Sequence, residues 1–260
     1  MHRIPHGRDR KNVANVRRPA VLVMHGLMMS SADFVIMGPV SALGYILAEE
    51  GFDVWLANAR GTYYSRKNLY LNPDSILDKR FWKFTWDEIG RIDLPAMIDY
   101  ELNATSHGKL HYIGHSQGTT SFFVMGSLLP EYNDKIISMN AMAPVAFMTH
   151  NKNPFLLALS VYADKAEILC DVLGLGELFP NTIVNQLAGE ALCRDQAITQ
   201  SLCSNILFLI AGWDPTQLNT TMLPAIFGHT PGGSSARQYA HYAQLDNSKD
   251  FRRYDYGSKL

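Results

Sequence analysis

Gly114-His115-Ser116-Gln117-Gly118 stands between a strand-like run, Leu110 to Ile113, and a helix-like run, Thr119 to Leu129. When a strand turns sharply into a helix, the residue at the apex is strained, and small residues two positions before and after it let the chains approach. Gly114 and Gly118 occupy those two positions. The pattern predicts a nucleophile elbow that presents Ser116 for acyl transfer. The alternative is a Gly-rich turn without chemistry, which the flanking strand and helix disfavour.

Acyl transfer also needs two backbone N–H groups that stabilise an oxyanion, one after the nucleophile and one from a loop after an earlier strand. The amide of Gln117, at the start of the following helix, is the first candidate. Leu27 follows the strand-like Ala20 to Met24 and the dipeptide His25-Gly26, so its amide is the second. The alternative for His25-Gly26 is a turn that only ends a strand.

Short apolar strands alternate with helical segments from Ala20 to about Pro144, which is typical of a parallel sheet covered on both faces. The fold class expected is α/β, a mainly parallel sheet with flanking helices and an inserted helical cap. The elements expected are strands at 20–24, 53–57, 110–113 and 135–141 and helices at 39–50, 84–102 and 119–129.

Beyond Pro144 no strand–helix repeat is visible, and helical segments continue from Phe155 to about Gln244. We therefore expect a partial core at 1–146, a helical cap or lid at 147–247, and a segment at 248–260 that returns to the core. Apolar residues of the cap either line an acyl-chain channel or, as we prefer, pack the cap itself. They are Phe155, Leu156, Leu157, Leu159 and Leu173.

The composition excludes several classes of protein. With 260 residues, of which 47% are hydrophobic, the chain can bury a large core. A net charge of -1 without a long basic run argues against nucleic-acid binding. No apolar run reaches the roughly 18 residues that cross a bilayer, and no apolar stretch typical of a signal peptide follows Met1.

Three cysteines, Cys170, Cys193 and Cys203, lack the spacing of a zinc site, so no metal is expected. Cys193 and Cys203 are near enough in sequence to close a short loop, but all three cysteines could equally be buried as free thiols. Candidate N-glycosylation sites are Asn103 and Asn219, each followed two residues later by Thr.

The remaining members of a Ser-Asp-His triad are not evident from the residues. Asp214, His229 and His241 follow Ser116 in the expected order, but both histidines lie in the expected cap, so we prefer structural roles for all three. His115 adjoins the serine, yet neighbouring side chains on an elbow point apart. We therefore expect it to pack beside the turn.

Several blocks of the sequence resemble the acid lipases, a family that comprises gastric and lysosomal enzymes and their insect relatives. The amino-acid sequence of the cap looks most like that of the insect members. The blocks are His2-Arg3-Ile4-Pro5, His25-Gly26-Leu27, Ala57-Asn58-Ala59-Arg60-Gly61, Tyr64-Ser65-Arg66, the runs 81–88 and 93–100, Gly114 to Thr120, Ala143-Pro144-Val145-Ala146, Leu202-Cys203-Ser204-Asn205 and Tyr254-Asp255-Tyr256-Gly257.

The resemblance implies a serine ester hydrolase that cleaves neutral lipid esters, such as triacylglycerols or sterol esters, at a lipid–water interface without a cofactor. It implies that Ser116 is the nucleophile and that the Leu27 and Gln117 amides form the oxyanion hole. It also implies a disulfide between Cys193 and Cys203, with Cys170 unpaired, in a secreted or lysosomal glycoprotein.

Two features of the family are not found in this sequence. Its members begin with a signal peptide, and their catalytic Asp and His follow the Tyr254 to Gly257 block, where this sequence ends at Leu260. The resemblance therefore implies an α/β-hydrolase fold without its carboxyl-terminal core strands, in a chain truncated at both ends. The alternative function is a catalytically inactive relative that binds lipid, and a third is another esterase or a peptidase of the same fold.

Overall fold

The computed structural model describes residues 1–8, 16–75, 78–153, 157, 160 and 176–257. The chain forms two compact units, Met1–Ser65 with Trp86–Ala146, and Arg66–Thr85 with Phe147–Leu260. The domain division expected from the sequence assigned 66–85 to the core, and it stays a prediction. Most of the apolar segment expected at 155–179 lies outside the described residues.

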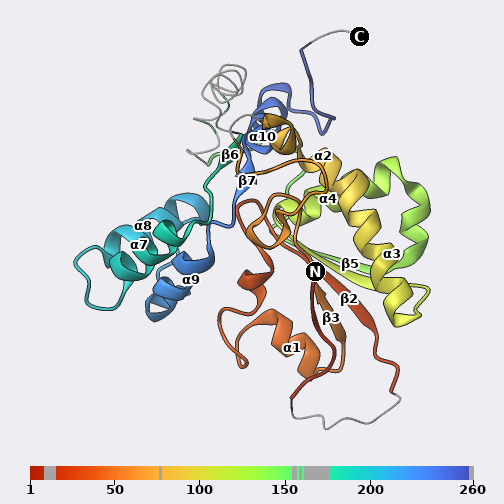
Figure 1. Cartoon of the computed structure of the whole chain (residues 1–260), viewed down its shortest axis with the longest axis horizontal. Helices are drawn as coiled ribbons and strands as arrows, with labels where there is room; N and C mark the ends of the chain where they lie inside the picture. Colours follow the sequence, from red (N-terminus) through yellow and green to blue (C-terminus); the bar gives the residue numbers. More distant parts are fainter. Residues whose placement is uncertain (9–15, 76–77, 154–156, 158–159, 161–175, 258–260) are drawn as a thin grey trace. The chain divides into compact units, whose positions relative to one another are not determined.

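The first unit is built on a five-stranded sheet with the strand order β1-β3-β2-β4-β5 (Figure 1). β2, β3, β4 and β5 run parallel, and β1 is antiparallel to β3 at one edge. The α/β class and the mainly parallel sheet expected from the sequence are confirmed. The strands are β1 (His2–Ile4), β2 (Ala20–Met24), β3 (Asp53–Leu56), β4 (Leu110–His115) and β5 (Ile136–Met142).

Helices cover both faces of this sheet (Figure 1). α1 packs beside β1 and β3, and α3 and α4 contact each other on the opposite face. The helical elements are η1 (Ser31–Phe34), α1 (Leu43–Glu49), η2 (Tyr63–Ser65), α2 (Trp86–Glu88), a π-helix η4 (Ile89–Asp93), α3 (Leu94–Thr105), α4 (Gln117–Leu128) and η5 (Pro130–Lys135).

The side chains of β2 alternate between the two layers. Val21 and Val23 lie in one buried cluster with Phe34, with Ala48 of α1 and with Leu56 of β3. Leu22 and Met24, one residue out of phase, point to the other face and are also fully buried. Both faces of β2 are therefore apolar, as in a strand at the centre of a parallel sheet.

A buried carboxyl group lies under the edge of this sheet. Glu101 of α3 is completely buried, and neither of its side-chain oxygens has a hydrogen-bond partner among the described residues. Its neighbours include Asp53, which forms a two-pronged ion pair with Arg3 at 2.7 and 2.8 Å. Burial, reinforced by the charge of Asp53, raises the pKa of Glu101 to about 9. The folded chain therefore holds Glu101 as a neutral acid at pH 7.

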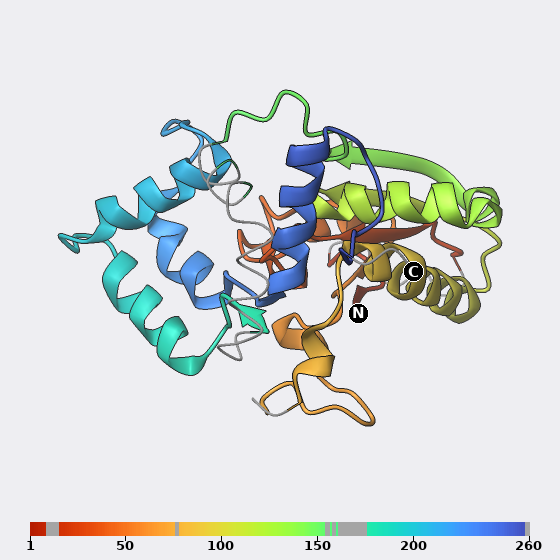
Figure 2. The same cartoon turned by 90° about the horizontal axis from the view of Figure 1, so that it is seen from above.

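Helices dominate the described part of the second unit, and α7 contacts both α8 and α9 (Figure 2). Cys193 and Cys203 form a disulfide between α7 and α8 and lie with Leu223 in a small buried core. The elements are η3 (Lys79–Trp82), β6 (Glu177–Leu178), α7 (Ile183–Cys193), α8 (Gln200–Ala211), η6 (Thr220–Met222), α9 (Leu223–His229), β7 (Ser234–Ser235) and α10 (Ala236–Ser248).

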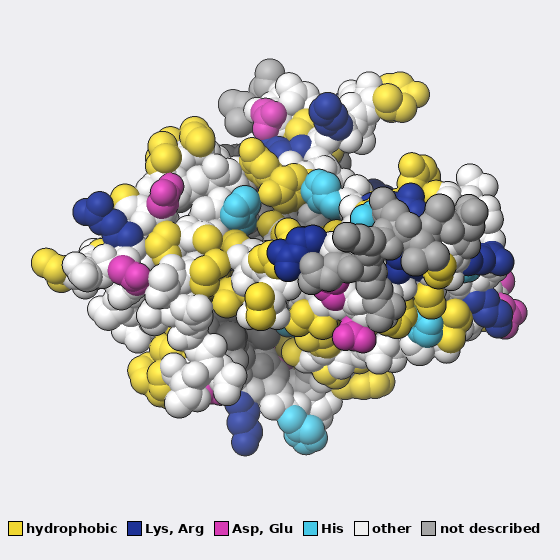
Figure 3. Space-filling view, turned by 90° about the horizontal axis from the view of Figure 1, so that it is seen from below, with side chains coloured by type: hydrophobic (Ala, Val, Ile, Leu, Met, Phe, Trp, Pro, Cys, Tyr) yellow, Lys and Arg dark blue, Asp and Glu magenta, His cyan; other side chains and the backbone are white. Residues whose placement is uncertain are grey.

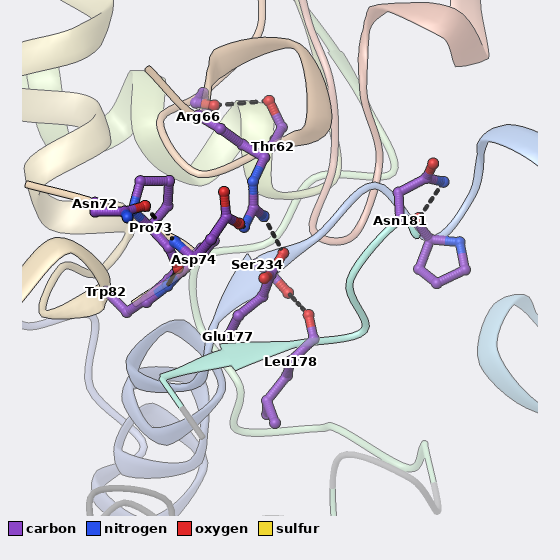
Figure 4. A network of polar contacts seen from close by, with 12 residues as sticks. Thr62, Arg66, Asn72, Pro73, Asp74, Trp82, Glu177, Leu178, Asn181 and Ser234 are labelled. Carbon is purple, nitrogen blue, oxygen red and sulfur yellow. Dashed lines mark hydrogen bonds and ion pairs between the residues drawn. The ribbon is translucent and has the colours of Figure 1, made fainter. Parts of the chain in front are cut away.

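A polar network joins the segment 66–85 to β6 within the second unit (Figure 4). The Arg66 guanidinium donates to Glu177 and, at 2.6 Å, to Asp74, and it lies 5.1 Å from the ring centroid of Trp82. The indole of Trp82 donates to the carbonyl of Pro73 at 3.0 Å. One arginine thus connects two parts of the sequence more than 100 residues apart.

Some elements differ from those expected. The helix expected from Pro39 begins only at Leu43, because residues 38–42 form a hydrogen-bonded turn and Ala42 is extended. The helix expected over 84–102 begins at Trp86 and contains a π-helical turn before Pro95. β6 and β7, which pair antiparallel, are strands that the sequence analysis did not predict. Strands of two residues are too short to produce a periodic pattern.

Candidate active site

Ser116 lies at the junction of β4 and α4, with φ 50° and ψ −116°. A positive φ is unfavourable for a residue with a Cβ atom, so the surrounding structure must hold this conformation in place. Its amide donates to the carbonyl of Met142 in β5 at 2.9 Å. The serine is half-buried and forms the N-cap of α4. The backbone is that of a sharp strand-to-helix elbow.

Gly114 and Gly118 lie where the elbow brings backbone against backbone. A Cβ atom on Gly118 would stand 2.5 Å from the carbonyl oxygen of Met24, and one on Gly114 would stand 2.9 Å from the backbone of Gly118. Both distances are shorter than any van der Waals contact. The buried phenol of Tyr112 donates to the carbonyl of Gly118 at 2.8 Å and fastens the first turn of α4 to β4.

The parallel register of β2 and β4 brings the segment after β2 to the serine. Met24 pairs with Gly114, so His25-Gly26 continues beside the elbow. A Cβ atom on Gly26 would lie 3.0 Å from the Cβ of Ser116 and 3.2 Å from Nδ1 of His115. The backbone that follows β2 therefore passes directly beside the serine.

The two amides expected to stabilise an oxyanion belong to the residues that directly follow Ser116 and Gly26 in the sequence. Gln117 is the first residue of α4, where an N–H has no acceptor within the helix. Leu27 directly follows Gly26, in a turn that the amide of Met29 closes by donating to the Gly26 carbonyl at 3.2 Å. The helix dipole adds positive potential at Gln117. Their assignment as the oxyanion hole stays a prediction.

His25 holds the segment after β2 in place. The ring is buried; its Nδ1 donates to the carbonyl of Gly26 at 2.7 Å, and its Nε2 accepts from the amide of Ala59 at 3.1 Å. These bonds require the neutral tautomer with the proton on Nδ1. Burial lowers the pKa of His25, which keeps that form in place. The imidazole thus links the segment beside Ser116 to the loop after β3.

Asn58, in the same loop after β3, links that loop to Ser31 at the start of η1. Its side chain accepts from the amide of Ser31 at 2.9 Å and donates to the Ser31 hydroxyl at 3.0 Å. His2 of β1 is hydrogen-bonded to the same hydroxyl at 2.8 Å. Sequence reasoning missed the roles of Asn58 and Ser31, because hydrogen bonds between distant loops leave no spacing in the sequence.

His115 packs beside the turn. Its Nδ1 is buried without a hydrogen-bond partner in the described part of the chain, and it faces Gly26. Burial lowers the pKa of this imidazole. His115 therefore fills space between the elbow and the segment after β2.

The other triad candidates belong to the second unit. His241 of α10 is buried; its Nε2 is hydrogen-bonded to the carbonyl of Arg252 at 3.0 Å, and its ring packs edge-on against Tyr254. Burial lowers its pKa to about 4. Asp214 is exposed and accepts from the Thr216 hydroxyl at 2.7 Å, and His229 ends α9. His241 is thus engaged with the segment that follows α10.

The remaining predicted sites lie as follows. Asn103 is exposed near the end of α3, and Asn219 is exposed at the start of η6. Cys170 lies outside the described residues. Among the residues that the structure describes, no group of three or more His, Cys, Asp or Glu side chains is arranged to hold a metal ion. Within the same part of the chain, no helix has both the length and the apolar character of a membrane span.

Comparison with known proteins agrees with the elbow and the sheet. A family model for the alpha/beta hydrolase fold matches residues 19–180. The chain belongs to the α/β-hydrolase fold family. A solved putative lipase from Sulfolobus solfataricus shares this fold with our α/β hydrolase, at a TM-score of 0.56 and 13% identity over 90% of the chain and 68% of the solved one.

Curated relatives of this α/β hydrolase are animal proteins named lipases. Lipase 1 of Drosophila melanogaster is 44% identical over 92% of the chain and 52% of its own length. Gastric triacylglycerol lipase of Mus musculus is 38% identical over 100% of the chain and 64% of its own length, and human Lipase member J is 38% identical over 99% and 69%. The α/β hydrolase therefore spans about half to two thirds of these relatives.

Proposed function

We propose that this α/β hydrolase is a serine ester hydrolase that cleaves neutral lipid esters such as triacylglycerols or sterol esters, with Ser116 as the nucleophile. The observation that carries the proposal is the positive φ of Ser116 at an elbow where Gly26 passes beside its Cβ atom. Relatives named lipases, one of them a gastric triacylglycerol lipase, support the substrate class.

The chemistry proposed is acyl transfer in two steps. Ser116 Oγ bonds to the ester carbonyl carbon while a base takes the hydroxyl proton, and the Gln117 and Leu27 amides stabilise the charge that develops on the carbonyl oxygen. The tetrahedral intermediate then expels the alcohol, which recovers the proton from the base, and leaves an acyl-serine. Water attacks this ester, releases the fatty acid and restores Ser116.

The resemblance to acid lipases assigns the base and its aspartate to positions after the Tyr254 to Gly257 block. His25 and His241 are poor alternatives, because the ring nitrogens of His25 are engaged by Gly26 and Ala59 and Nε2 of His241 by Arg252. The described residues thus supply the nucleophile and the oxyanion donors of the proposed reaction.

Contact with a lipid–water interface is supported by the second unit. α8 contains no charged residue, and apolar side chains on α7 and α8 are largely exposed. Apolar side chains lie exposed over this helical lobe, at the left of Figure 3. A lipid surface would cover such side chains at little desolvation cost. They are Ile183, Val184, Leu187, Leu192, Leu202, Ile206 and Leu209.

We further infer a secreted or lysosomal setting. Disulfides persist in oxidising compartments, and Cys193 and Cys203 are bonded to each other. The two candidate glycosylation sites, Asn103 and Asn219, are both exposed, as a glycan requires.

A fluorophosphonate probe tests the proposed chemistry, because it phosphonylates only an activated serine. We expect one label per full-length protein, located on Ser116 by peptide mass spectrometry and abolished in Ser116→Ala. Ser127→Ala, which removes an exposed hydroxyl from the same helix, is the matched control and should label normally. A folded protein that binds a fluorescent fatty-acid ester without being labelled would instead be a non-catalytic lipid-binding relative.

A further inference from the structure

We propose that Thr119 is a positioning residue that holds the Ser116 elbow in its reactive conformation by tying the serine's carbonyl to the segment that follows β5. The inference rests on the proposed function of Ser116. Thr119 lies on the first turn of α4 and is completely buried.

The Thr119 hydroxyl makes two hydrogen bonds with fixed directions. It donates to the carbonyl of Ser116 at 2.6 Å and accepts from the amide of Val145 at 3.0 Å. A hydroxyl has one proton, and a backbone N–H can only donate, so the bonds run from Val145 through Thr119 to Ser116. Such a chain of hydrogen bonds strengthens each member in a buried setting.

Thr120 completes the same connection. Its hydroxyl donates to the carbonyl of Val145 at 2.7 Å, so two consecutive threonines bind both backbone polar groups of one residue. Val145 lies between β5 and the end of the first unit at Ala146, where it belongs to no helix or strand. The two threonine side chains therefore satisfy the backbone N–H and C=O of Val145, which backbone hydrogen bonds satisfy within a helix or a sheet. We call Thr119, Thr120 and Val145 the threonine clasp.

Both backbone polar groups of Ser116 are thereby fixed. Its amide donates to Met142 at the end of β5, and its carbonyl accepts from the amide of Thr119 at 2.9 Å as well as from the hydroxyl. A residue with φ 50° persists only when its surroundings hold it there. β5 fixes the strained serine on one side, and the threonine clasp fixes it on the other.

The variant that isolates this role is Thr119→Val, which has nearly the same shape and no hydroxyl. It removes the side-chain donor to the Ser116 carbonyl and the only acceptor that the described residues offer the Val145 amide. Because Thr119 is buried and would not touch the ester, we expect the attack by Ser116 to slow while the affinity for substrate stays the same.

The experiment compares full-length wild type with Thr119→Val, Thr119→Ser and Thr120→Val, and with Ser127→Ala as the control. Two quantities are measured: the second-order rate of fluorophosphonate labelling, and kcat and KM for a water-soluble short-chain ester. We expect Thr119→Val to lower the labelling rate and kcat at least tenfold with KM within twofold. Thr119→Ser should keep most of the wild-type labelling rate and kcat. Thr120→Val should lower both quantities less than Thr119→Val does.

Labelling of Thr119→Val at the wild-type rate, or equal slowing in Thr119→Ser, would overturn the proposal. Hydrogen exchange at the Ser116 and Val145 amides separates it from the proposed function. If the wild type is not labelled at all, the proposed hydrolase function is refuted. The hydrogen-exchange rates of the Ser116 and Val145 amides then still test the threonine clasp. Faster exchange in Thr119→Val than in Thr119→Ser supports it, and equal exchange overturns it.

Discussion

Gly118 is a position where an added methyl group would meet backbone and could not be accommodated by a side-chain movement. Its Cβ would lie 2.5 Å from the Met24 carbonyl oxygen, so β2 and α4 would have to separate. We expect Gly118→Ala to lower the free energy of unfolding by about 2 kcal/mol, the usual cost of overpacking. Because the shift occurs two residues from Ser116, fluorophosphonate labelling should slow more than tenfold. Urea denaturation and labelling kinetics measure the two effects.

Gly108→Ala is the matched control for that substitution. A Cβ atom there would meet no heavy atom within 4 Å, so both stability and labelling should stay near wild type. If Gly108→Ala and Gly118→Ala lower stability and the labelling rate equally, the close backbone contact at the elbow is not the cause of the effect.

Individual residues of the site differ in how far the sequence reveals them. Ser116, Gly114 and Gly118 follow a fixed spacing, because the elbow is local in sequence, and their conformations agree with that spacing. Thr119 and Asn58 act through hydrogen bonds to Val145 and Ser31, both more than 25 residues away. Those contacts depend on which strands are neighbours, and no spacing within one segment encodes that.

Arg66 is the main polar link between the segment 66–85 and β6 (Figure 4). Lysine keeps the charge, but its single nitrogen cannot replace the two separate guanidinium nitrogens that donate to Glu177 and Asp74, and it has no planar group to stack over Trp82. We expect Arg66→Lys to destabilise the second unit by about 1–2 kcal/mol. Limited proteolysis should then cut the segment 66–85 sooner than in wild type.

Arg80→Lys provides the control, since Arg80 is largely exposed and is paired with Asp78 from two residues away. An exposed local ion pair contributes little to stability. If both variants are cleaved at the same rate, Arg66 does not anchor the segment.

Elements with a clear period were predictable, and those without one were not. β2 is a continuous apolar run, β4 leads directly into the elbow, and α4 follows it at once. The start of α1 was predicted too early, because the turn at Gly38 depends on a positive φ that the apolar pattern does not record. β6 and β7 exist through pairing with each other, which is a tertiary contact.

The whole first unit carries a pH dependence through Glu101. Its pKa of about 9 in the folded chain exceeds the ordinary 4.5, so the unfolded chain loses this proton first as pH rises. The stability that the neutral acid provides is complete below about pH 4.5 and falls by about 1.4 kcal/mol per pH unit up to about 9. Glu101→Gln stays neutral, so between pH 5 and 7 it should lose about 2–3 kcal/mol less stability than wild type.

Urea denaturation at pH 5, 6, 7 and 8 measures that difference, and Glu131→Gln is the control with an exposed carboxyl group. The effect of Glu101 opposes that of the buried histidines. His241, with a pKa of about 4, costs stability as pH falls below its ordinary 6.5. Parallel pH curves for wild type and Glu101→Gln would mean that Glu101 is ionised in the fold.

At the scale of the molecule, the sequence predicted the sheet and its helices, since burial on both faces leaves a strong apolar pattern. It did not predict that residues 66–85 cluster with the second unit. The segment has no strand or helix pattern like that of the core, and its membership depends on Arg66, on Trp82 and on the bond from the Ser235 hydroxyl to the Phe84 carbonyl at 2.6 Å.

The pairing of Met24 with Gly114 also bears on how such a chain can evolve. Ser116, the proposed nucleophile, and the segment that would stabilise its oxyanion lie side by side because two parallel strands are in one register. An insertion in the exposed segment 67–70, which lies outside every helix and strand, leaves this register unchanged. One residue added within β2 would shift the segment by about 3.3 Å and turn its side chains to the opposite face. Exposed loops away from the site are therefore free to diversify, while the proposed reaction fixes the lengths of β2 and β4.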